Sequence, residues 1–149
     1  MDFGFGTFLA FLSDGVRSLN RKVIVSQSKR TLVLVEDGVE MQATLKEYLE
    51  RLGYSVQPFS EPQKAIQYFS ALGEEVWKNI TIITDLGLPG ISGIELIKKI
   101  RSLSQIPPII LISATVTPSQ REQALAQGAM VILDKPFRLE RLKMLIEGC

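Results

Sequence analysis

The sequence predicts an open α/β fold with a mainly parallel β-sheet and right-handed crossover connections. Short strand-like segments alternate with amphipathic helix-like segments five times along residues 31–149. Three of the strand-like segments are almost continuously apolar, which is typical of parallel strands covered on both faces. The chain has 149 residues, of which 46% are hydrophobic, so its length and composition fit one folded domain.

The predicted strands are short and rich in β-branched residues, which favour extended backbone. The apolar runs within them cover residues 32–35, 80–83 and 109–112. These three runs are therefore expected at the centre of the sheet. In chain order, the five predicted strands are Thr31–Val35, Ser55–Phe59, Ile80–Thr84, Pro108–Ile112 and Met130–Asp134.

A helix is predicted after each strand from apolar residues that recur at helical spacing. In the first, the apolar residues that fall mostly on one face are Val39, Leu45, Tyr48, Leu49 and Leu52. Ser92 is a candidate N-cap for the third helix, with Glu95 at the spacing of a capping box. The five predicted helices cover residues 39–52, 62–72, 92–103, 118–127 and 137–147.

Composition excludes several classes of chemistry. The chain contains no histidine, which excludes His-based acid–base catalysis, His-containing zinc sites and the phosphohistidine of a kinase. One cysteine, Cys149, excludes an internal disulfide framework. The formal net charge of +1 indicates no strong attraction to nucleic acid or to a membrane surface. No apolar run approaches the roughly 20 residues of a membrane-spanning helix, so we expect a cytoplasmic protein without a transmembrane segment.

Residues 1–30 differ from the rest of the chain. They carry five basic and two acidic residues, whereas residues 31–149 have a net charge of −2. The boundary at residue 30 separates an N-terminal extension with a basic linker from the domain at 31–149. Apolar spacing over residues 4–20 predicts an amphipathic helix that docks on the domain, a partner or a second copy. The alternatives are a frayed extension or linker and, third, a helix on a membrane surface.

Polar residues follow the predicted strands at the edge where ligands bind in open α/β folds. Glu36 and Asp37 follow the first strand, Asp85 the third, Ser113 the fourth and Lys135 the fifth. Clustered carboxylates repel one another unless a cation neutralises them, and oxygen ligands suit Mg²⁺ or Mn²⁺. Such a site commonly takes phosphate oxygens as further ligands, and one carboxylate can act as a nucleophile that forms an aspartyl phosphate.

Four motifs carry a resemblance to the receiver domain of the two-component response-regulator family. They are the sequences at 32–37, 85–93, 112–114 and 134–137, each at or just after a predicted strand. The resemblance covers about residues 31–147. It implies a flavodoxin-like, doubly wound (βα)5 sandwich with a five-stranded parallel sheet in the order 2-1-3-4-5. The interval from Asp37 to Asp85 is a few residues longer than usual, and the extra residues are expected around residues 74–79.

The resemblance implies a metal site and a phosphoacceptor. Asp85 would accept a phosphoryl group from a phosphohistidine on a sensor histidine kinase or a histidine phosphotransfer protein. Asp37 would hold Mg²⁺ directly, and Glu36 directly or through water. The side chain of Asp85 and the backbone carbonyl of Gly87 would complete the protein ligands.

The resemblance also implies residues that respond to the phosphoryl group. Lys135 would pair with it, and the peptide bond from Lys135 to Pro136 is expected to be cis. The hydroxyl of Ser113 would swing onto the phosphorylated aspartate. Ile132 stands at the switch position, where many members of the family have Tyr or Phe. An isoleucine cannot provide the aromatic coupling to Ser113 that is usual in the family. Gly87 also offers no side chain to the site.

Each residue has a plain structural interpretation as well. Glu36 and Asp37 suit the N-terminus of a helix, and Asp85 suits the start of a turn. Ser113 can cap a loop, and Lys135 can form a surface pair with its acidic neighbour. The complete set, in order after the strands, favours the site.

The leading functional hypothesis is a phosphorylation-dependent signalling switch that catalyses only its own phosphoryl transfer and autodephosphorylation. The sequence contains no output domain, so we expect a stand-alone receiver or a piece of a hybrid kinase. It would act on an unknown downstream protein through the face formed by the fourth helix, the fifth strand and the fifth helix. A homodimer is a further possibility.

Three alternatives stay open beside it. A degenerate receiver would act as a constitutive interaction module. An aspartyl-nucleophile phosphohydrolase usually has a second Asp where Gly87 stands. A flavin binder would need a phosphate loop where residues 36–40 are acidic.

Overall fold

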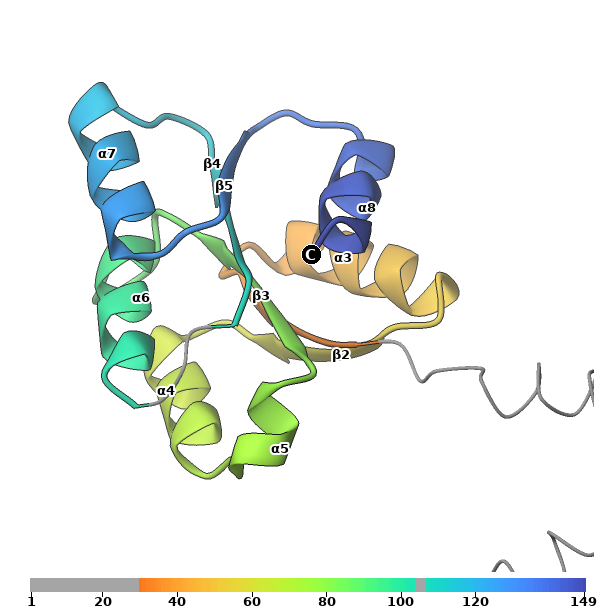
Figure 1. The fold of residues 1–149 in the computed structure, drawn as a ribbon. Helices are drawn as coiled ribbons and strands as arrows, with labels where there is room; N and C mark the ends of the chain where they lie inside the picture. The colour runs from red at the N-terminus through yellow and green to blue at the C-terminus, as the bar shows by residue number, and fades with distance from the viewer. Residues whose placement is uncertain (1–29, 104–106) are drawn as a thin grey trace, which may run out of the picture.

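A computed structural model describes residues 30–103 and 107–149. Its sheet has five parallel strands in the order β2-β1-β3-β4-β5, which confirms the predicted fold class and strand order (Figure 1). The hypothesis of an amphipathic helix over residues 4–20 lies outside the described residues. The strands are β1 Thr31–Val35, β2 Ser55–Phe59, β3 Ile80–Asp85, β4 Ile109–Ser113 and β5 Val131–Asp134.

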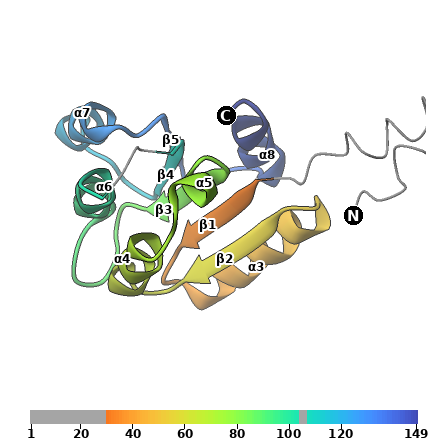
Figure 2. The ribbon, with the colours of Figure 1, turned by 60° about the horizontal axis from the view of Figure 1, so that its bottom comes forward.

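Helices cover both faces of the sheet, as Figures 1 and 2 show. The core on one face receives buried side chains from α4, α5, α6 and α7, and the core on the other face from α3 and α8. No helix in the described part of the chain is both long and apolar enough to cross a membrane. The helices are α3 Val39–Arg51, α4 Pro62–Ser70, α5 Glu74–Trp77, α6 Gly93–Arg101, α7 Pro118–Gln127 and α8 Leu139–Glu147.

Strand β1 shows how the apolar runs form two cores. Successive side chains of a strand point to opposite faces, so a strand covered on both faces is apolar at every position. Leu32 and Leu34 lie in the core under α3 and α8. Val33 and Val35 lie in the core under α4 to α7. All four side chains are fully buried, so packing on both faces holds β1, including its carboxyl end, in position.

Among the helices that the structure describes, α6 and α7 have side-chain caps at their N-termini. The Oγ of Ser92 accepts a hydrogen bond from the backbone N–H of Glu95 at 3.2 Å, which confirms Ser92 as the N-cap of α6. A complete capping box lies at α7, where Thr117 and Gln120 exchange hydrogen bonds of 3.0 and 3.1 Å. The sequence analysis did not single out this second pair. Both caps begin helices that follow strands carrying site residues.

Some predicted details are wrong. Val39 was grouped with the apolar face of the first helix, but it is 80% exposed because, six positions before Leu45, it lies about 120° around α3 from that face. The fourth strand begins at Ile109, since Pro108 has no N–H to donate to the ladder. The prediction of extra residues around 74–79 is not among these errors: residues 74–77 form the short helix α5, whose Trp77 stacks on Phe69 with ring centroids 5.2 Å apart.

Candidate functional site

Three carboxylates meet at the carboxyl edge of the sheet. Glu36 and Asp37 follow β1, and Asp85 ends the neighbouring strand β3. One oxygen of each carboxylate lies within 4.8 Å of an oxygen of the other two. Glu36 and Asp85 are buried, whereas Asp37 is exposed. The pairing of β1 with β3 therefore brings together acidic residues 48 positions apart in the sequence.

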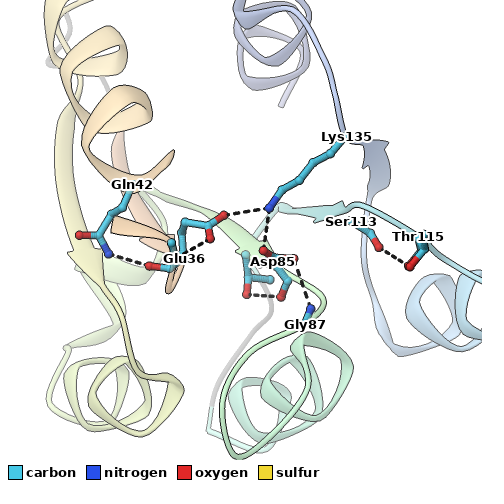
Figure 3. A network of polar contacts seen from close by, with 9 residues as sticks. Glu36, Gln42, Asp85, Gly87, Ser113, Thr115 and Lys135 are labelled. Atoms are coloured by element: carbon cyan, nitrogen blue, oxygen red, sulfur yellow. Dashed lines mark hydrogen bonds and ion pairs between the residues drawn. The ribbon is translucent and has the colours of Figure 1, made fainter. Parts of the chain in front are cut away.

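Lys135 lies between two of these carboxylates (Figure 3). Its Nζ donates hydrogen bonds to Oδ2 of Asp85 at 2.8 Å and to Oε1 of Glu36 at 3.2 Å. Burial by itself lowers the pKa of Lys135, but its hydrogen bonds and attraction to Asp85 and Glu36 raise that pKa above its ordinary value. The ammonium is therefore charged at neutral pH and partly balances the acidic cluster.

The turn after β5 directs Lys135 toward the cluster. The peptide bond between Lys135 and Pro136 is cis, as expected from the sequence. The backbone N–H of Lys135 donates to the carbonyl of Ser113 at 2.7 Å, which joins the turn to the end of β4. The lysine side chain thus reaches across from β5 to residues that follow β1 and β3.

Glu36 is the most deeply buried acid of the cluster. Its Oε2 accepts a hydrogen bond from the backbone N–H of Gly38 at 2.9 Å. Burial raises the pKa of Glu36, and the negative charge of Asp85 adds to that rise, while Gly38 and Lys135 oppose it. The metal-free site therefore holds one carboxylate that ionises less readily than an ordinary glutamate.

Asp85 is held by the loop that follows β3. Its Oδ1 accepts a hydrogen bond from the N–H of Gly87 at 3.2 Å. The N–H of Leu86 donates to Ile112 on β4, and the carbonyl of Leu86 accepts from Gly93 at the start of α6, both at 2.8 Å. A Cβ on Gly93 would lie 2.3 Å from the backbone oxygen of Asp85, so α6 can begin this close only with glycine.

Ser113 is buried at the end of β4, but its hydroxyl does not face the acidic cluster. The Oγ donates to the backbone carbonyl of Thr115 at 2.6 Å, and Figure 3 shows it directed away from Asp85. Ile132 is half-buried on β5 and packs against the same core as Val116 in the loop after β4. Ser113 thus contacts this loop directly, whereas Ile132 pairs with Leu111 on β4.

One residue near the cluster was missed by the sequence analysis. Gln42, in the first turns of α3, donates from Nε2 to the backbone oxygen of Glu36 at 2.8 Å (Figure 3) and to Oγ of Ser60 at 3.2 Å. Gln42 lies about one helical turn after Gly38 and so close to the acidic pair. This spacing is the feature of the sequence that could have identified it. The sequence analysis likewise assigned no role to Ser60, which follows β2.

The donor set fits a hard divalent cation. Carboxylate oxygens are the ligands that Mg²⁺ and Mn²⁺ prefer, and the chain supplies no imidazole. The exposed Asp37 leaves the cluster open to water and to further ligands. A Mg²⁺ ion at this position would sit beside one nucleophilic carboxylate and one ammonium, an arrangement suited to phosphoryl transfer.

Comparison with known proteins identifies the family to which this chain belongs. The family model of the response regulator receiver domain matches residues 32–147. The response regulator RppA of Synechocystis is 32% identical over 112 residues, which cover 74% of this chain and 46% of RppA. The two-component response regulator ARR16 of Arabidopsis thaliana is 35% identical over 88 residues, which cover 56% of this chain and 54% of ARR16. The chain thus spans about half the length of these curated relatives.

Solved structures show the same fold. The chemotaxis response regulator CheY4 of Vibrio cholerae matches 80% of this chain and 98% of its own, with a TM-score of 0.71 at 23% identity. A response regulator of Burkholderia pseudomallei matches 79% of this chain and 66% of its own, with a TM-score of 0.69 at 25% identity. That protein was solved with a phosphorylated aspartic acid, a calcium ion and citrate.

Proposed function

Because this chain belongs to the response regulator receiver domain family, we propose that it is a phosphorylation-dependent signalling switch with Asp85 as the phosphoacceptor. The observation that carries the proposal is the position of Asp85, whose Oδ2 lies 2.8 Å from Lys135 and beside two further carboxylates. A carboxylate suited to act as a nucleophile, the ammonium of Lys135 and three carboxylates suited to hold a metal thus lie together at the edge of the sheet where ligands bind in such folds. The phosphorylated aspartic acid and calcium ion of the Burkholderia relative support the same chemistry.

In the proposed reaction, a carboxylate oxygen of Asp85 attacks the phosphorus of a phosphohistidine. An oxygen–phosphorus bond forms while the nitrogen–phosphorus bond breaks, and the imidazole leaves with the electron pair and takes a proton from water. Lys135 would move its hydrogen bond from the carboxylate of Asp85 to a phosphoryl oxygen. The donor would be a sensor histidine kinase or a histidine phosphotransfer protein.

The metal would be held by Glu36, Asp37 and Asp85, with the backbone carbonyl of Gly87 as a further ligand. When bound, Mg²⁺ or Mn²⁺ would neutralise the clustered carboxylates and the charge of the phosphoryl oxygens. Asp37 is suited to direct ligation because it is exposed. Glu36 is suited to hold a fixed oxygen because its carboxylate is buried and bonded to Gly38.

The proposed signal starts at Ser113. Its hydroxyl would leave the carbonyl of Thr115, which it contacts at 2.6 Å, and donate to a phosphoryl oxygen on Asp85. The loop between β4 and α7 would follow, and Ile132 would repack because it shares a core with that loop. This change would shift the population of states of the α7–β5–α8 face, which would contact a downstream protein.

A phosphohydrolase with an aspartyl nucleophile is the competing interpretation. Such an enzyme needs a general acid near the leaving group, and Gly87 provides no side chain for this role. We therefore propose that the chain catalyses only its own phosphoryl transfer and the hydrolysis of its own aspartyl phosphate.

The test is incubation of the metal-free chain with acetyl phosphate, with and without Mg²⁺, followed by intact mass and by phosphate release. The proposal expects one phosphoryl group per chain, gained only with Mg²⁺. Rapid, repeated phosphate release would favour a phosphohydrolase. No gain, together with no binding of beryllofluoride, would favour a degenerate receiver.

A further inference from the structure

We propose that Gln42 is a positioning residue that orients the acidic pair Glu36–Asp37 for metal binding. The inference rests on the proposed function and assigns a role to a side chain outside the acidic cluster. Gln42 lies on α3, and its Nε2 donates to the backbone oxygen of Glu36 at 2.8 Å. That oxygen belongs to the peptide group that joins Glu36 to Asp37, and a peptide group is planar and rigid. The hydrogen bond therefore fixes the plane from which the Asp37 side chain projects.

Asp37 depends on this backbone because its side chain has no other support in the described part of the chain. Within residues 30–103 and 107–149, no side chain or backbone group forms a hydrogen bond or ion pair with the Asp37 carboxylate. Glu36, by contrast, is held by Gly38 and Lys135. Before metal binds, the position of the exposed carboxylate is therefore set by the backbone of residues 36–38.

Gln42 contributes a contact that the other bonds of this loop do not replace. The N–H of Glu36 donates to the carbonyl of Phe59 at 2.9 Å, which fixes the preceding peptide group. The N–H of Gln42 donates to the carbonyl of Gly38 at 2.8 Å, which fixes the following turn into α3. Between these two points, the carbonyl of Glu36 is held by the Gln42 side chain.

Ser60 completes the arrangement. A glutamine amide nitrogen has two hydrogens, and Nε2 of Gln42 has two acceptors, the oxygen of Glu36 and Oγ of Ser60 at 3.2 Å. The serine follows β2, so the glutamine joins the loop after β1 to the loop after β2. The second bond fixes the amide plane of Gln42, which keeps the first bond directed at the metal-site loop.

Residues that orient metal ligands typically change metal affinity by about tenfold to a hundredfold when they are replaced. We expect the Gln42→Met variant, which keeps the length of the side chain and loses both donors, to bind Mn²⁺ about tenfold more weakly than the wild type. Ser60→Ala, which removes the second acceptor only, should weaken binding about twofold to threefold. The ligands themselves are intact, so phosphoryl uptake should return at saturating metal. If Gln42 only stabilised the fold, its replacement would lower the thermal midpoint of unfolding, and saturating metal would not restore phosphoryl uptake.

The experiment is a titration of the full metal-free chain with Mn²⁺, followed by electron paramagnetic resonance, with thermal unfolding measured on each variant. Gln67→Met is the matched control, since Gln67 is an exposed residue of α4 whose side chain has no hydrogen bond within the described residues. Its Mn²⁺ affinity should equal that of the wild type.

The outcomes separate this inference from the proposed function. A wild-type chain that does not bind Mn²⁺ overturns the metal site and this inference with it. If the wild type binds Mn²⁺ and Gln42→Met binds it with the same affinity, only the role of Gln42 is overturned. If Gln42→Met does not fold, Ser60→Ala decides, and an affinity equal to that of the wild type overturns the inference.

Discussion

Lys135 Nζ lies 2.8 Å from Oδ2 of Asp85, although the two residues are 50 positions apart in the sequence. The same ammonium lies 3.2 Å from Oε1 of Glu36. In the metal-free protein, Lys135 therefore provides positive charge at the position where a bound cation would act. In the proposed metal-bound state, Lys135 and the metal ion would together balance the charge of the acidic cluster.

Lys135→Ala should bind Mg²⁺ and Mn²⁺ more tightly than the wild type, because it removes a positive charge that repels the incoming cation. The expected gain is about threefold to tenfold, since charges a few ångströms apart in a water-accessible site exchange roughly 1 kcal/mol. Phosphoryl uptake at saturating metal should fall. Mn²⁺ titration checks the affinity, and Lys135→Arg, which keeps the charge, serves as the control. An unchanged or weaker affinity in Lys135→Ala would contradict the prediction.

The metal affinity should depend on pH through Glu36. Burial raises the pKa of Glu36 above its ordinary value of 4.5, so the folded metal-free protein holds this proton more tightly than the unfolded chain. The resulting stability is complete below about pH 4.5 and is lost as the pH rises through the folded pKa. Metal binding needs the ionised carboxylate, so affinity should fall as the pH is lowered through the same raised pKa.

Mn²⁺ titrations over a pH series measure this dependence. Glu36→Gln should bind more weakly at neutral pH and should show a shallower pH dependence, because one titrating ligand has been removed. Glu50→Gln, an exposed acid of α3, is the control and should keep the wild-type profile. Identical profiles for Glu36→Gln and the wild type would exclude Glu36 as a ligand.

Ser113→Ala should separate phosphorylation from the conformational response. The hydroxyl donates to Thr115 and not to Asp85, so its removal leaves the carboxylate of Asp85 unchanged and costs about 1 kcal/mol in the free energy of unfolding. Uptake from acetyl phosphate should persist. The amide chemical shifts of residues 114–116 should change on phosphorylation in the wild type and in Ser113→Thr, but much less in Ser113→Ala. Equal shift changes in all three proteins would rule out the proposed role of the hydroxyl.

Gly93→Ala should be strongly destabilising. A Cβ at this position would meet the backbone oxygen of Asp85 at 2.3 Å and the backbone Cα of Leu86 at 3.0 Å, and neither backbone atom can move aside as the end of a flexible side chain could. We expect a loss of roughly 3 kcal/mol in the free energy of unfolding, measured by urea denaturation. Gly87→Ala is the matched control in the same loop, because nothing lies within 4 Å of the added carbon. Its stability should stay within about 0.5 kcal/mol of the wild type.

Features set by local pattern could be predicted from the sequence. The run 80–83 is apolar except for Thr81 because β3 is covered on both faces, and this pattern is visible in a short window of the sequence. Once the strands were known to be parallel, their carboxyl ends had to meet at one edge. The structure brings Glu36, Asp37, Asp85 and Lys135 together there.

Features set by contacts between distant loops could not be predicted. The bonds of Gln42 depend on the distance from α3 to the loop after β2, which no local pattern encodes. The partner of the Ser113 hydroxyl depends on a side-chain rotamer. Val39, by contrast, lies six positions before Leu45, about 120° around the helix from it, so helical periodicity itself places Val39 off the apolar face, in agreement with its exposure.

The most direct test of the central claim is the location of the phosphoryl group. After reaction with acetyl phosphate and Mg²⁺, borohydride reduction converts an aspartyl phosphate to homoserine, which mass spectrometry detects in a tryptic digest. The fragment of residues 79–98 contains Asp85 as its single aspartate, so the assignment is unambiguous. Our account predicts homoserine at position 85 and none in the Asp85→Asn protein or without Mg²⁺. Homoserine at another acidic residue, or none in the wild type, would contradict it.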